Sequence, residues 1–331
     1  MIKIAINGFG RIGRNLFRLL INHPNIEVVA INDIADNKTM SHLLKYDSIH
    51  GILKNEITFN DRGILVDQRL IPFFHEREIQ NLNWSSLQID YVIESTGKFK
   101  TFEEIHKHIE VGAKRVILSA PAEVENIKTV VLGVNEHILD GTELIVSNAS
   151  CTTNNAAPMI KVIQELCGIE QAYITTVHSY TTDQSLHDQP HKDLRRARGA
   201  AQSIVPTTTG AAKALTKIFP ELDGKMGGCG IRVPVPDGSL TDITFNVKRE
   251  VTIDQINSAF KYASETSLKN ILDYTNDPIV SVDIIGNTNS CLFDSQLTSV
   301  IDKMVKVVGW YDNEIGYSSR IIDLISYINK F

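Results

Sequence analysis

The sequence contains few cysteines, no long apolar run, no internal repeat and no excess of positive charge. Its four cysteines are Cys151, Cys167, Cys229 and Cys291. They form no C-x-x-C pair and no metal-ligand spacing, so we expect neither a disulfide framework nor a metal centre. A net charge of −6 and a pI of about 5.9 give no overall field that attracts nucleic acid or a membrane surface. These absences favour a globular protein with reduced thiols in the cytoplasm.

The length of 331 residues is large for a single hydrophobic core and predicts two domains. Residues 1–7 (MIKIAIN) predict a first β-strand. They form neither a signal peptide nor a segment long enough to span a bilayer, so no membrane partner is expected.

A glycine-rich turn follows this strand. Gly8, Gly10 and Gly13 form the pattern G-x-G-x-x-G, a helical pattern comes next, and a second strand over residues 28–32 ends at Asp33. Such glycines let the backbone approach a pyrophosphate at the helix N-terminus, and the acid accepts the adenosine ribose hydroxyls. A glycine-rich turn without a ligand is the alternative, but strand, helix and acid together predict a dinucleotide site. Asp33 favours NAD over NADP, because a 2′-phosphate would meet a like charge.

Further strand and helix patterns continue through the first half. Short strands are expected over residues 57–59, 64–66 and 70–74, and a helix over 101–111. Buried-strand patterns over 90–94 and 115–118 end in polar residues at 95–97 and 119–121. Polar residues at the carboxyl ends of parallel strands line the ligand crevice of open α/β sheets, so these segments predict one edge of the site.

Cys151 is the candidate nucleophile. A strand over residues 143–146 leads into the small polar run S-N-A-S-C-T-T-N, after which a helical pattern begins. A thiol at a helix N-terminus has its pKa lowered by free backbone N–H groups and the helix dipole. Ser150 and Thr152 add hydroxyl groups that suit an anion beside the thiolate. A buried structural cysteine in a helix cap is the alternative.

His178 follows a strand predicted over residues 172–177. A histidine at a strand end is usually structural, but a fold can bring it beside a cysteine at a helix start. Such a pair generates a thiolate and later supplies an acid.

The second half also carries candidate anion sites. Residues 179–203 form a long loop that holds several basic residues, and its length suggests function or a subunit contact. A P-T-T-T-G-A-A run at residues 206–212 caps another helix. Arg232 lies in an apolar strand, which favours an anionic substrate group. A solvated basic face for the loop and a structural ion pair for Arg232 remain the alternatives.

The fold class follows from the element order. Strands expected over residues 240–247, 280–283, 292–293 and 304–308 are interrupted by one helix over 253–268. We expect an α/β chain with a Rossmann-type dinucleotide-binding domain and an α+β catalytic domain built on a mixed or antiparallel sheet. The expected domains are residues 1–150, completed by a C-terminal helix over 315–331, and residues 151–314.

Several of these motifs resemble those of the phosphorylating glyceraldehyde-3-phosphate dehydrogenases, and the resemblance spans nearly the whole chain. The most specific are N-G-F-G-R-I-G-R at residue 7, S-N-A-S-C-T-T-N at 147, T-T-V-H-S-Y-T at 175 and W-Y-D-N-E-I-G-Y-S at 310. The H-K-D-L-R-R-A-R run at residue 191 resembles the bacterial branch.

The resemblance implies a role for each matching position. It makes Cys151 the nucleophile and His178 its base and acid. It implies that the substrate phosphate is held by Thr181, Lys192 and Arg232, and attacking inorganic phosphate by Ser150, Thr152, Thr209 and Gly210, with Arg196 nearby. It implies that NAD is contacted by Arg11, Ile12, Asp33, Arg77, Ser119 and Asn313, in addition to the glycine turn.

The resemblance implies an activity and an assembly as well. The activity is NAD-dependent oxidation and phosphorylation of D-glyceraldehyde 3-phosphate to 1,3-bisphosphoglycerate through a Cys151 thioester, in glycolysis or gluconeogenesis. A homotetramer is implied too, and the long loop supports it. Three other activities stay open here: an erythrose-4-phosphate dehydrogenase, a non-phosphorylating aldehyde dehydrogenase and a binding module that uses the basic loop. Asn155 departs from the family pattern, since members commonly carry a second cysteine there.

Overall fold

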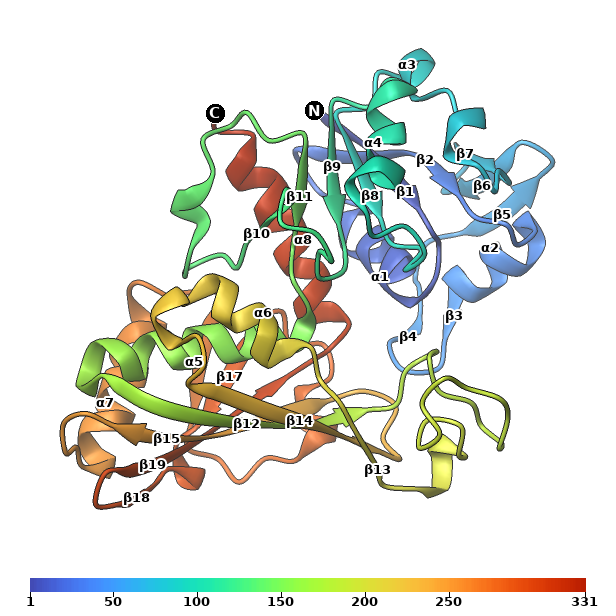
Figure 1. The fold of residues 1–331 in the computed structure, drawn as a ribbon. Helices are drawn as coiled ribbons and strands as arrows, with labels where there is room; N and C mark the ends of the chain where they lie inside the picture. Colours follow the sequence, from blue (N-terminus) through green and yellow to red (C-terminus); the bar gives the residue numbers. More distant parts are fainter. The chain divides into compact units, whose positions relative to one another are not determined.

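The computed structural model describes all 331 residues, which form two compact units (Figure 1). Unit 1 comprises residues 1–130, 137–149 and 318–331, and unit 2 comprises residues 131–136 and 150–317. None of the helices combines the length and apolar content needed to cross a lipid bilayer.

Unit 1 is built on a nine-stranded sheet with the order β10-β11-β9-β8-β1-β2-β7-β6-β5. The strands from β10 to β7 pair in parallel, and β6 and β5 extend the sheet antiparallel. The order β7-β2-β1-β8-β9-β11 is that of dinucleotide-binding folds, so the predicted Rossmann-type sheet is confirmed. The strands are β1 (Ile2–Asn7), β2 (Ile26–Asn32), β5 (Ile57–Asn60), β6 (Gly63–Val66), β7 (Arg69–Phe74), β8 (Tyr91–Glu94), β9 (Arg115–Leu118), β10 (Lys128–Thr129) and β11 (Ile145–Ser147).

Local capping explains where the helices of unit 1 begin. Thr101 and Glu104 form a reciprocal capping box at the start of α4, and the side chain of Asp36 accepts a hydrogen bond from the Thr39 N–H at the start of α2. The helices of this unit are α1 (Arg11–Leu20), α2 (Asn37–Lys45), α3 (Trp84–Leu87), α4 (Phe102–Glu110) and most of α8 (Ile315–Ile328); β3 (Tyr46–Asp47) and β4 (Gly51–Ile52) form a small separate hairpin.

Unit 2 is built on an eight-stranded mixed sheet. The main path is β13-β14-β12-β15-β19-β17-β16, and β18 pairs with β19. β12 pairs in parallel with β14 and β16 with β17, whereas the remaining pairs are antiparallel, so the predicted mixed sheet is confirmed. The strands are β12 (Ile169–Ser179), β13 (Val205–Thr207), β14 (Met226–Val233), β15 (Ser239–Val247), β16 (Leu272–Thr275), β17 (Cys291–Asp294), β18 (Ser299–Ile301) and β19 (Met304–Tyr311).

Three helices cover one face of this sheet: α5 (Cys151–Cys167), α6 (Ala211–Ile218) and α7 (Ile253–Glu265) (Figure 1). The central helix α5 packs on β12, β15, β17 and β19 and contacts both α6 and α7. Burial of its apolar residues Met159, Ile160 and Ile163 fixes α5 on the sheet and so fixes its first residue, Cys151.

One predicted strand is wrong. Residues 280–283 do not join the sheet; Ser281–Ile284 is a 3₁₀ helix (η5) whose Asp283 carboxylate accepts a hydrogen bond from the Val280 N–H at 2.8 Å. The other 3₁₀ turns are η1 (Ile79–Asn81), η2 (Glu136–Ile138), η3 (Ala200–Gln202), η4 (Pro220–Leu222) and η6 (Ser295–Leu297). The expected long loop is present, since no helix or strand lies between β12 and η3.

Candidate active site

Cys151 is the first residue of α5, as its sequence context predicts. The side chain of Ser150 caps this helix, because its Oγ accepts a hydrogen bond from the Thr153 N–H at 3.1 Å. This cap fixes the direction in which α5 leaves the preceding chain, and with it the position of the Cys151 thiol.

β12 and β14 together bring His178 to that thiol. The parallel register of the two strands places His178 beside Arg232, and His178 Nε2 lies 3.4 Å from Cys151 Sγ. The three side chains predicted separately from a helix start, a strand end and an apolar strand therefore lie in one cluster.

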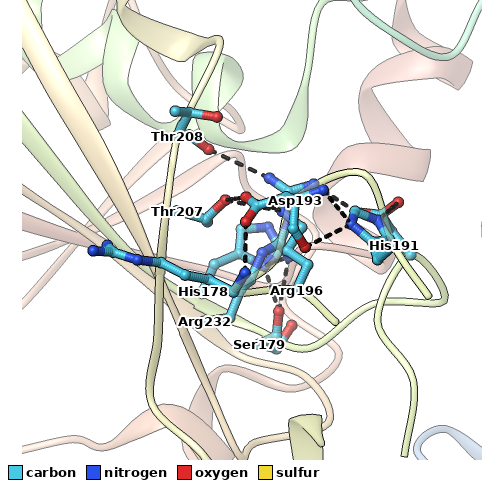
Figure 2. Close-up of polar contacts among 10 residues, drawn as sticks. His178, Ser179, His191, Asp193, Arg196, Thr207, Thr208 and Arg232 are labelled. Atoms are coloured by element: carbon cyan, nitrogen blue, oxygen red, sulfur yellow. Dashed lines mark hydrogen bonds and ion pairs between the residues drawn. The ribbon is translucent and has the colours of Figure 1, made fainter. Parts of the chain in front are cut away.

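Both possible hydrogen positions on His178 are accommodated by its neighbours. Nδ1 lies 2.8 Å from the Ser179 carbonyl oxygen and 2.7 Å from Arg232 Nη1, which also donates to the same carbonyl at 2.9 Å (Figure 2). With hydrogen on Nδ1, that N–H donates to the carbonyl and Nε2 is open to accept the thiol proton. With hydrogen on Nε2, the bare Nδ1 accepts from Arg232 and Nε2–H faces the sulfur.

The electrostatics of the cluster differ from the sequence-based expectation in one respect. Desolvation by the surrounding protein raises the pKa of the Cys151 thiol above its ordinary value, although the Arg232 charge and the Thr152 backbone N–H act to lower it. The expected lowering of the thiol pKa by the helix N-terminus is therefore smaller than the increase caused by burial. Burial, and then the Arg232 charge, lower the pKa of His178 to about 3, so its imidazole is neutral near pH 7 and able to accept a proton.

Tyr311 was not predicted as a site residue. Its hydroxyl lies 3.0 Å from Thr152 Oγ1 and 3.0 Å from Thr176 Oγ1, and its ring meets the His178 ring edge-to-face at 5.8 Å. Tyr311 therefore links α5 to β12 directly under the Cys151–His178 pair. The only signal in the sequence is its place at the end of a strand, which does not identify partners in distant segments.

A second cluster surrounds Arg196 in the long loop (Figure 2). The guanidinium donates to Asp183 Oδ2 at 2.5 Å and to Thr207 Oγ1 at 2.9 Å. Thr207 Oγ1 in turn donates to Asp193 Oδ2 at 3.0 Å, and Arg196 Nη2 reaches the Thr208 carbonyl at 3.4 Å. Part of the basic loop is thus held by carboxylates and by β13, not spread as a uniformly solvated basic face.

The remaining predicted anion ligands lie on segments adjoining these clusters. Ser150 and Thr152 lie at the start of α5, and Thr152 is buried. Thr209 Oγ1 accepts a hydrogen bond from Ala211 N at 3.2 Å, and Gly210 is the N-cap residue of α6. Lys192 is exposed in the loop, and Thr181 begins a turn closed by a 2.9 Å hydrogen bond from the Gln184 N–H to its carbonyl.

Unit 1 contains a cavity of about 250 Å³ whose lining includes Gly8, Gly10, Asp33, Arg77 and Thr96. The glycines are needed for close packing: a Cβ on Gly8, where φ is +96°, would lie 2.6 Å from Thr96 N, and one on Gly13 would lie 2.2 Å from the Gly8 oxygen. At Gly10, by contrast, a Cβ would meet open space at the start of α1. The turn therefore leaves the N-terminus of α1 accessible to a diphosphate, as a dinucleotide requires.

The other residues predicted to contact the dinucleotide form hydrogen bonds with different groups of the protein. Asp33 accepts hydrogen bonds from Phe9 N at 2.7 Å and Ala35 N at 3.0 Å. Arg11 forms a bidentate pair with Asp47 at 2.5 and 3.2 Å, and Ile12 follows it in α1. Ser119 donates its backbone N–H to the Glu94 carbonyl at 2.9 Å. In unit 2, Asn313 Oδ1 accepts from the hydroxyls of Ser179 and Ser239 at 2.8 and 2.7 Å, which directs its amide NH₂ away from both.

Known protein families match both parts of the chain. Residues 2–102 match the family described as glyceraldehyde 3-phosphate dehydrogenase, NAD binding domain, and residues 150–313 match its C-terminal domain. Similar proteins include glyceraldehyde-3-phosphate dehydrogenase of Geobacillus stearothermophilus, 53% identical over 329 residues, which covers 99% of this chain and 98% of that protein. Glyceraldehyde-3-phosphate dehydrogenase 2 of Streptomyces avermitilis is 54% identical over 332 residues, covering 99% of each chain. The chain therefore belongs to the glyceraldehyde-3-phosphate dehydrogenase family.

Proposed function

We propose that this chain catalyses the NAD-dependent oxidation of D-glyceraldehyde 3-phosphate and its phosphorylation to 1,3-bisphosphoglycerate. The observation that carries the proposal is the 3.4 Å approach of Cys151 Sγ to His178 Nε2 beside Arg232. Family membership supports the same activity, and because the similar proteins are glyceraldehyde-3-phosphate dehydrogenases, erythrose 4-phosphate is not the favoured substrate.

The first step uses the Cys–His pair. His178 Nε2 takes the thiol proton of Cys151, and the sulfur attacks the aldehyde carbon. The imidazolium returns that proton to the aldehyde oxygen, which gives a hemithioacetal and a neutral His178. His178 then acts as the base for the hydroxyl proton as the carbon is oxidised to a thioester. Bound NAD supplies the acceptor for the hydride. The His178 N–H and the Cys151 backbone N–H are the donors available to the developing oxyanion.

Inorganic phosphate completes the reaction by attacking the thioester carbon. The carbon–sulfur bond breaks, the acyl phosphate leaves and the Cys151 thiolate regains a proton from the His178 imidazolium. We assign the substrate phosphate to Thr181, Lys192 and Arg232. Attacking phosphate is assigned to Ser150, Thr152, Thr209 and Gly210, with Arg196 nearby. Two sites are needed because one phosphate belongs to the aldehyde and the other attacks.

The dinucleotide is assigned to unit 1, with Asn313 as a further contact from unit 2. Gly8, Gly10 and Gly13 give the diphosphate access to α1, and the Asp33 carboxylate has remaining lone pairs for the ribose hydroxyls. Arg11, Ile12, Arg77 and Ser119 complete this assignment.

We propose residues 1–150 and 315–331 as the dinucleotide domain and residues 151–314 as the catalytic domain. A cytoplasmic location is proposed from the four free thiols.

Formation of reduced nicotinamide, followed by absorbance, tests this function directly. Glyceraldehyde 3-phosphate should be oxidised rapidly only when inorganic phosphate is present, and faster than erythrose 4-phosphate. Cys151→Ser should abolish turnover, and His178→Asn should slow it roughly 10²–10⁴-fold. Cys229→Ser is the control, because Cys229 lies on β14 and is distant in sequence from both residues of the pair. Phosphate-independent turnover, or wild-type rates in Cys151→Ser, would show the assignment to be wrong.

A further inference from the structure

A chain of buried polar groups lies behind the dinucleotide cavity of unit 1. Glu94 ends β8 and has 1% of its surface exposed, and His108 of α4 and Trp84 of α3 are both fully buried. The Trp84 Nε1–H donates to His108 Nδ1 at 3.0 Å, and His108 Nε2 lies 3.2 Å from Glu94 Oε2. None of these three side chains has a part in the reaction described above.

The indole determines which nitrogen of His108 carries hydrogen. Because Trp84 can only donate, His108 Nδ1 must accept, and the neutral ring then carries its hydrogen on Nε2. That N–H faces Glu94 Oε2. Asn7 Nδ2 lies 3.4 Å from the same ring nitrogen, but with hydrogen on Nε2 the two are both donors, so the Asn7 amide donates to Glu94 Oε2 at 2.5 Å instead.

The Glu94 carboxylate is therefore surrounded by donors from several segments. Oε2 accepts from Asn7 and His108, and Oε1 accepts from the backbone N–H of Thr96 at 2.9 Å and from its hydroxyl. A carboxylate is an acceptor only, so every one of these groups must present a hydrogen to it.

The orientation of the Asn7 amide determines that of the Asn32 amide, which in turn contacts the backbone of Glu76. With its NH₂ on Glu94, Asn7 presents Oδ1 to Asn32 Nδ2 at 2.7 Å. Asn32 then presents its own Oδ1 to the Glu76 N–H at 2.9 Å, while its NH₂ reaches the Glu76 carbonyl at 3.0 Å. Asn7, Asn32, Glu76 and Thr96 come after or at the ends of four strands, and all four line the cavity.

We propose that Glu94, oriented by His108 and Trp84, is a positioning residue for the dinucleotide. One buried carboxylate fixes the amide direction of Asn7 and Asn32 and holds the Thr96 segment, so that four segments of the cavity wall keep one arrangement. The inference rests on the assignment of NAD to this cavity. It gives Glu94 no contact with the reacting atoms.

Calorimetric titration with NAD and with ADP-ribose, which lacks the nicotinamide, tests this role. Glu94→Gln keeps the shape but replaces one acceptor oxygen by a donor, which must then face either Thr96 or Asn7 and His108. We expect the Kd of both ligands to rise about tenfold. The KM of NAD should rise in parallel, while kcat at saturating NAD and the KM values of the aldehyde and phosphate stay within about twofold of wild type. Tyr91→Phe, a buried polar change on the same strand, is the control and should leave both Kd values unchanged.

A second variant keeps the test decisive if Glu94→Gln does not fold. Trp84→Phe frees His108 to take the other tautomer, so that Asn7 can donate to the ring instead of to Glu94; we expect a smaller rise in the ADP-ribose Kd, about threefold. Trp310→Phe also removes an indole bond to a carboxylate, at Asp294 in unit 2, and should have no such effect. Wild-type ADP-ribose affinity in folded Glu94→Gln, or in Trp84→Phe, would overturn the inference alone. Failure of the unmodified enzyme to bind NAD would overturn it together with the proposed function.

Discussion

The acidity of the Cys151 thiol depends on two opposing effects. Burial raises its pKa, whereas the positive charge of Arg232 lowers it, and the same charge also lowers the pKa of the His178 imidazole. Arg232 therefore favours the thiolate and disfavours the imidazolium. A histidine that is neutral near pH 7 can accept the thiol proton when substrate arrives. The nearby positive charge stabilises the thiolate that remains.

Arg232→Gln should make the thiol of the ligand-free enzyme harder to ionise. Loss of the cation raises the pKa of Cys151, so the pH midpoint of its alkylation by iodoacetamide should shift to higher pH, and alkylation near pH 7 should slow. Rates measured from about pH 6 to about pH 10 give the midpoint. Arg249→Gln, which removes a charge near Cys167 instead, should leave the midpoint of Cys151 unchanged. A shift to lower pH in Arg232→Gln would contradict the assigned role of the charge.

Some residues at this scale could be identified from the sequence and others could not. Cys151, His178 and Asp33 each occupy a recognisable place, at a helix start or a strand end, and the structure brings Cys151 and His178 together. Glu94, His108 and Tyr311 look like ordinary members of a strand or helix. Their partners lie 14 to 159 positions away in the chain, so only the folded arrangement reveals them.

At the level of elements, the hydroxyl group of one residue links the long loop after β12 to β13. Thr207 Oγ1 of β13 accepts a hydrogen bond from Arg196 Nε and donates one to Asp193, so it joins the strand to one basic and one acidic side chain of the loop. Thr207→Val preserves the size of the side chain but removes both bonds. Because a hydrogen bond to a charged group contributes about 1.5–3 kcal/mol, we expect the KM for inorganic phosphate to rise about tenfold or more.

The KM for NAD should stay unchanged in Thr207→Val, since neither Thr207 nor its two partners are among the residues assigned to the dinucleotide. Steady-state kinetics that vary each ligand separately provide the comparison. Thr216→Val on α6 is the matched control: its hydroxyl donates only to the Lys213 carbonyl within the same helix. Equal changes in the two KM values of Thr207→Val would indicate general disruption and contradict a role specific to the loop.

Two elements show why patterns of short segments mislead. The apolar residues at 280–283 suggest a strand, but Asp283 caps the Val280 N–H and a 3₁₀ turn forms instead. In β14 the sequence pattern instead misses most of a strand that is present. Gly227, Gly228 and Gly230 give no strand pattern, so only Ile231–Val233 predicts it. Gly228 is required there, since a Cβ would lie 2.9 Å from the Ile174 oxygen on β12. Long periodic segments such as α5 and β12 were predictable because their burial repeats along many residues.

The stability of the whole fold should depend on a buried group of carboxylates in unit 2. Asp237 is fully buried; burial, and then the charges of Asp312 and Glu314, raise its pKa to about 8. The ordinary value of about 4 applies to the unfolded chain, so the folded protein binds more protons between these values. The contribution of Asp237 to stability therefore falls as the pH rises from about 4 to about 8.

Asp237→Asn removes this dependence. Relative to wild type, the free energy of unfolding of the variant should increase as the pH rises through that window, and the difference should level off above about pH 8. Urea unfolding at several pH values measures it. Asp302→Asn, an exposed aspartate in the same unit with a left-handed backbone that Asn also adopts, is the control. A difference between Asp237→Asn and wild type that stays constant with pH would exclude the proposed titration.

The sheet of unit 2 has one face covered by α5, α6 and α7 (Figure 1). Its other face carries exposed apolar side chains. Along β12, Ala172, Ile174 and Thr176 are buried, whereas Tyr173 between them is 53% exposed. Ile301 of β18 is 63% exposed. Exposed apolar residues grouped on one sheet face are typical of a subunit interface. Together with the length of the loop, they support the homotetramer expected from the sequence.

We therefore expect light scattering at micromolar concentration to give a mass close to that of four 36.9 kDa chains. Tyr173→Glu places a charge on the outward face of β12, where burial against another subunit would cost several kcal/mol, and should shift the mass toward smaller species. Tyr262→Glu is the matched control, because Tyr262 is 69% exposed on α7, on the face of the sheet that the helices already cover. A wild-type mass near that of one chain would rule out the tetramer. Equal dissociation by both substitutions would instead show that the sheet face is not the interface, since a charge on α7 should not disturb a contact made through β12.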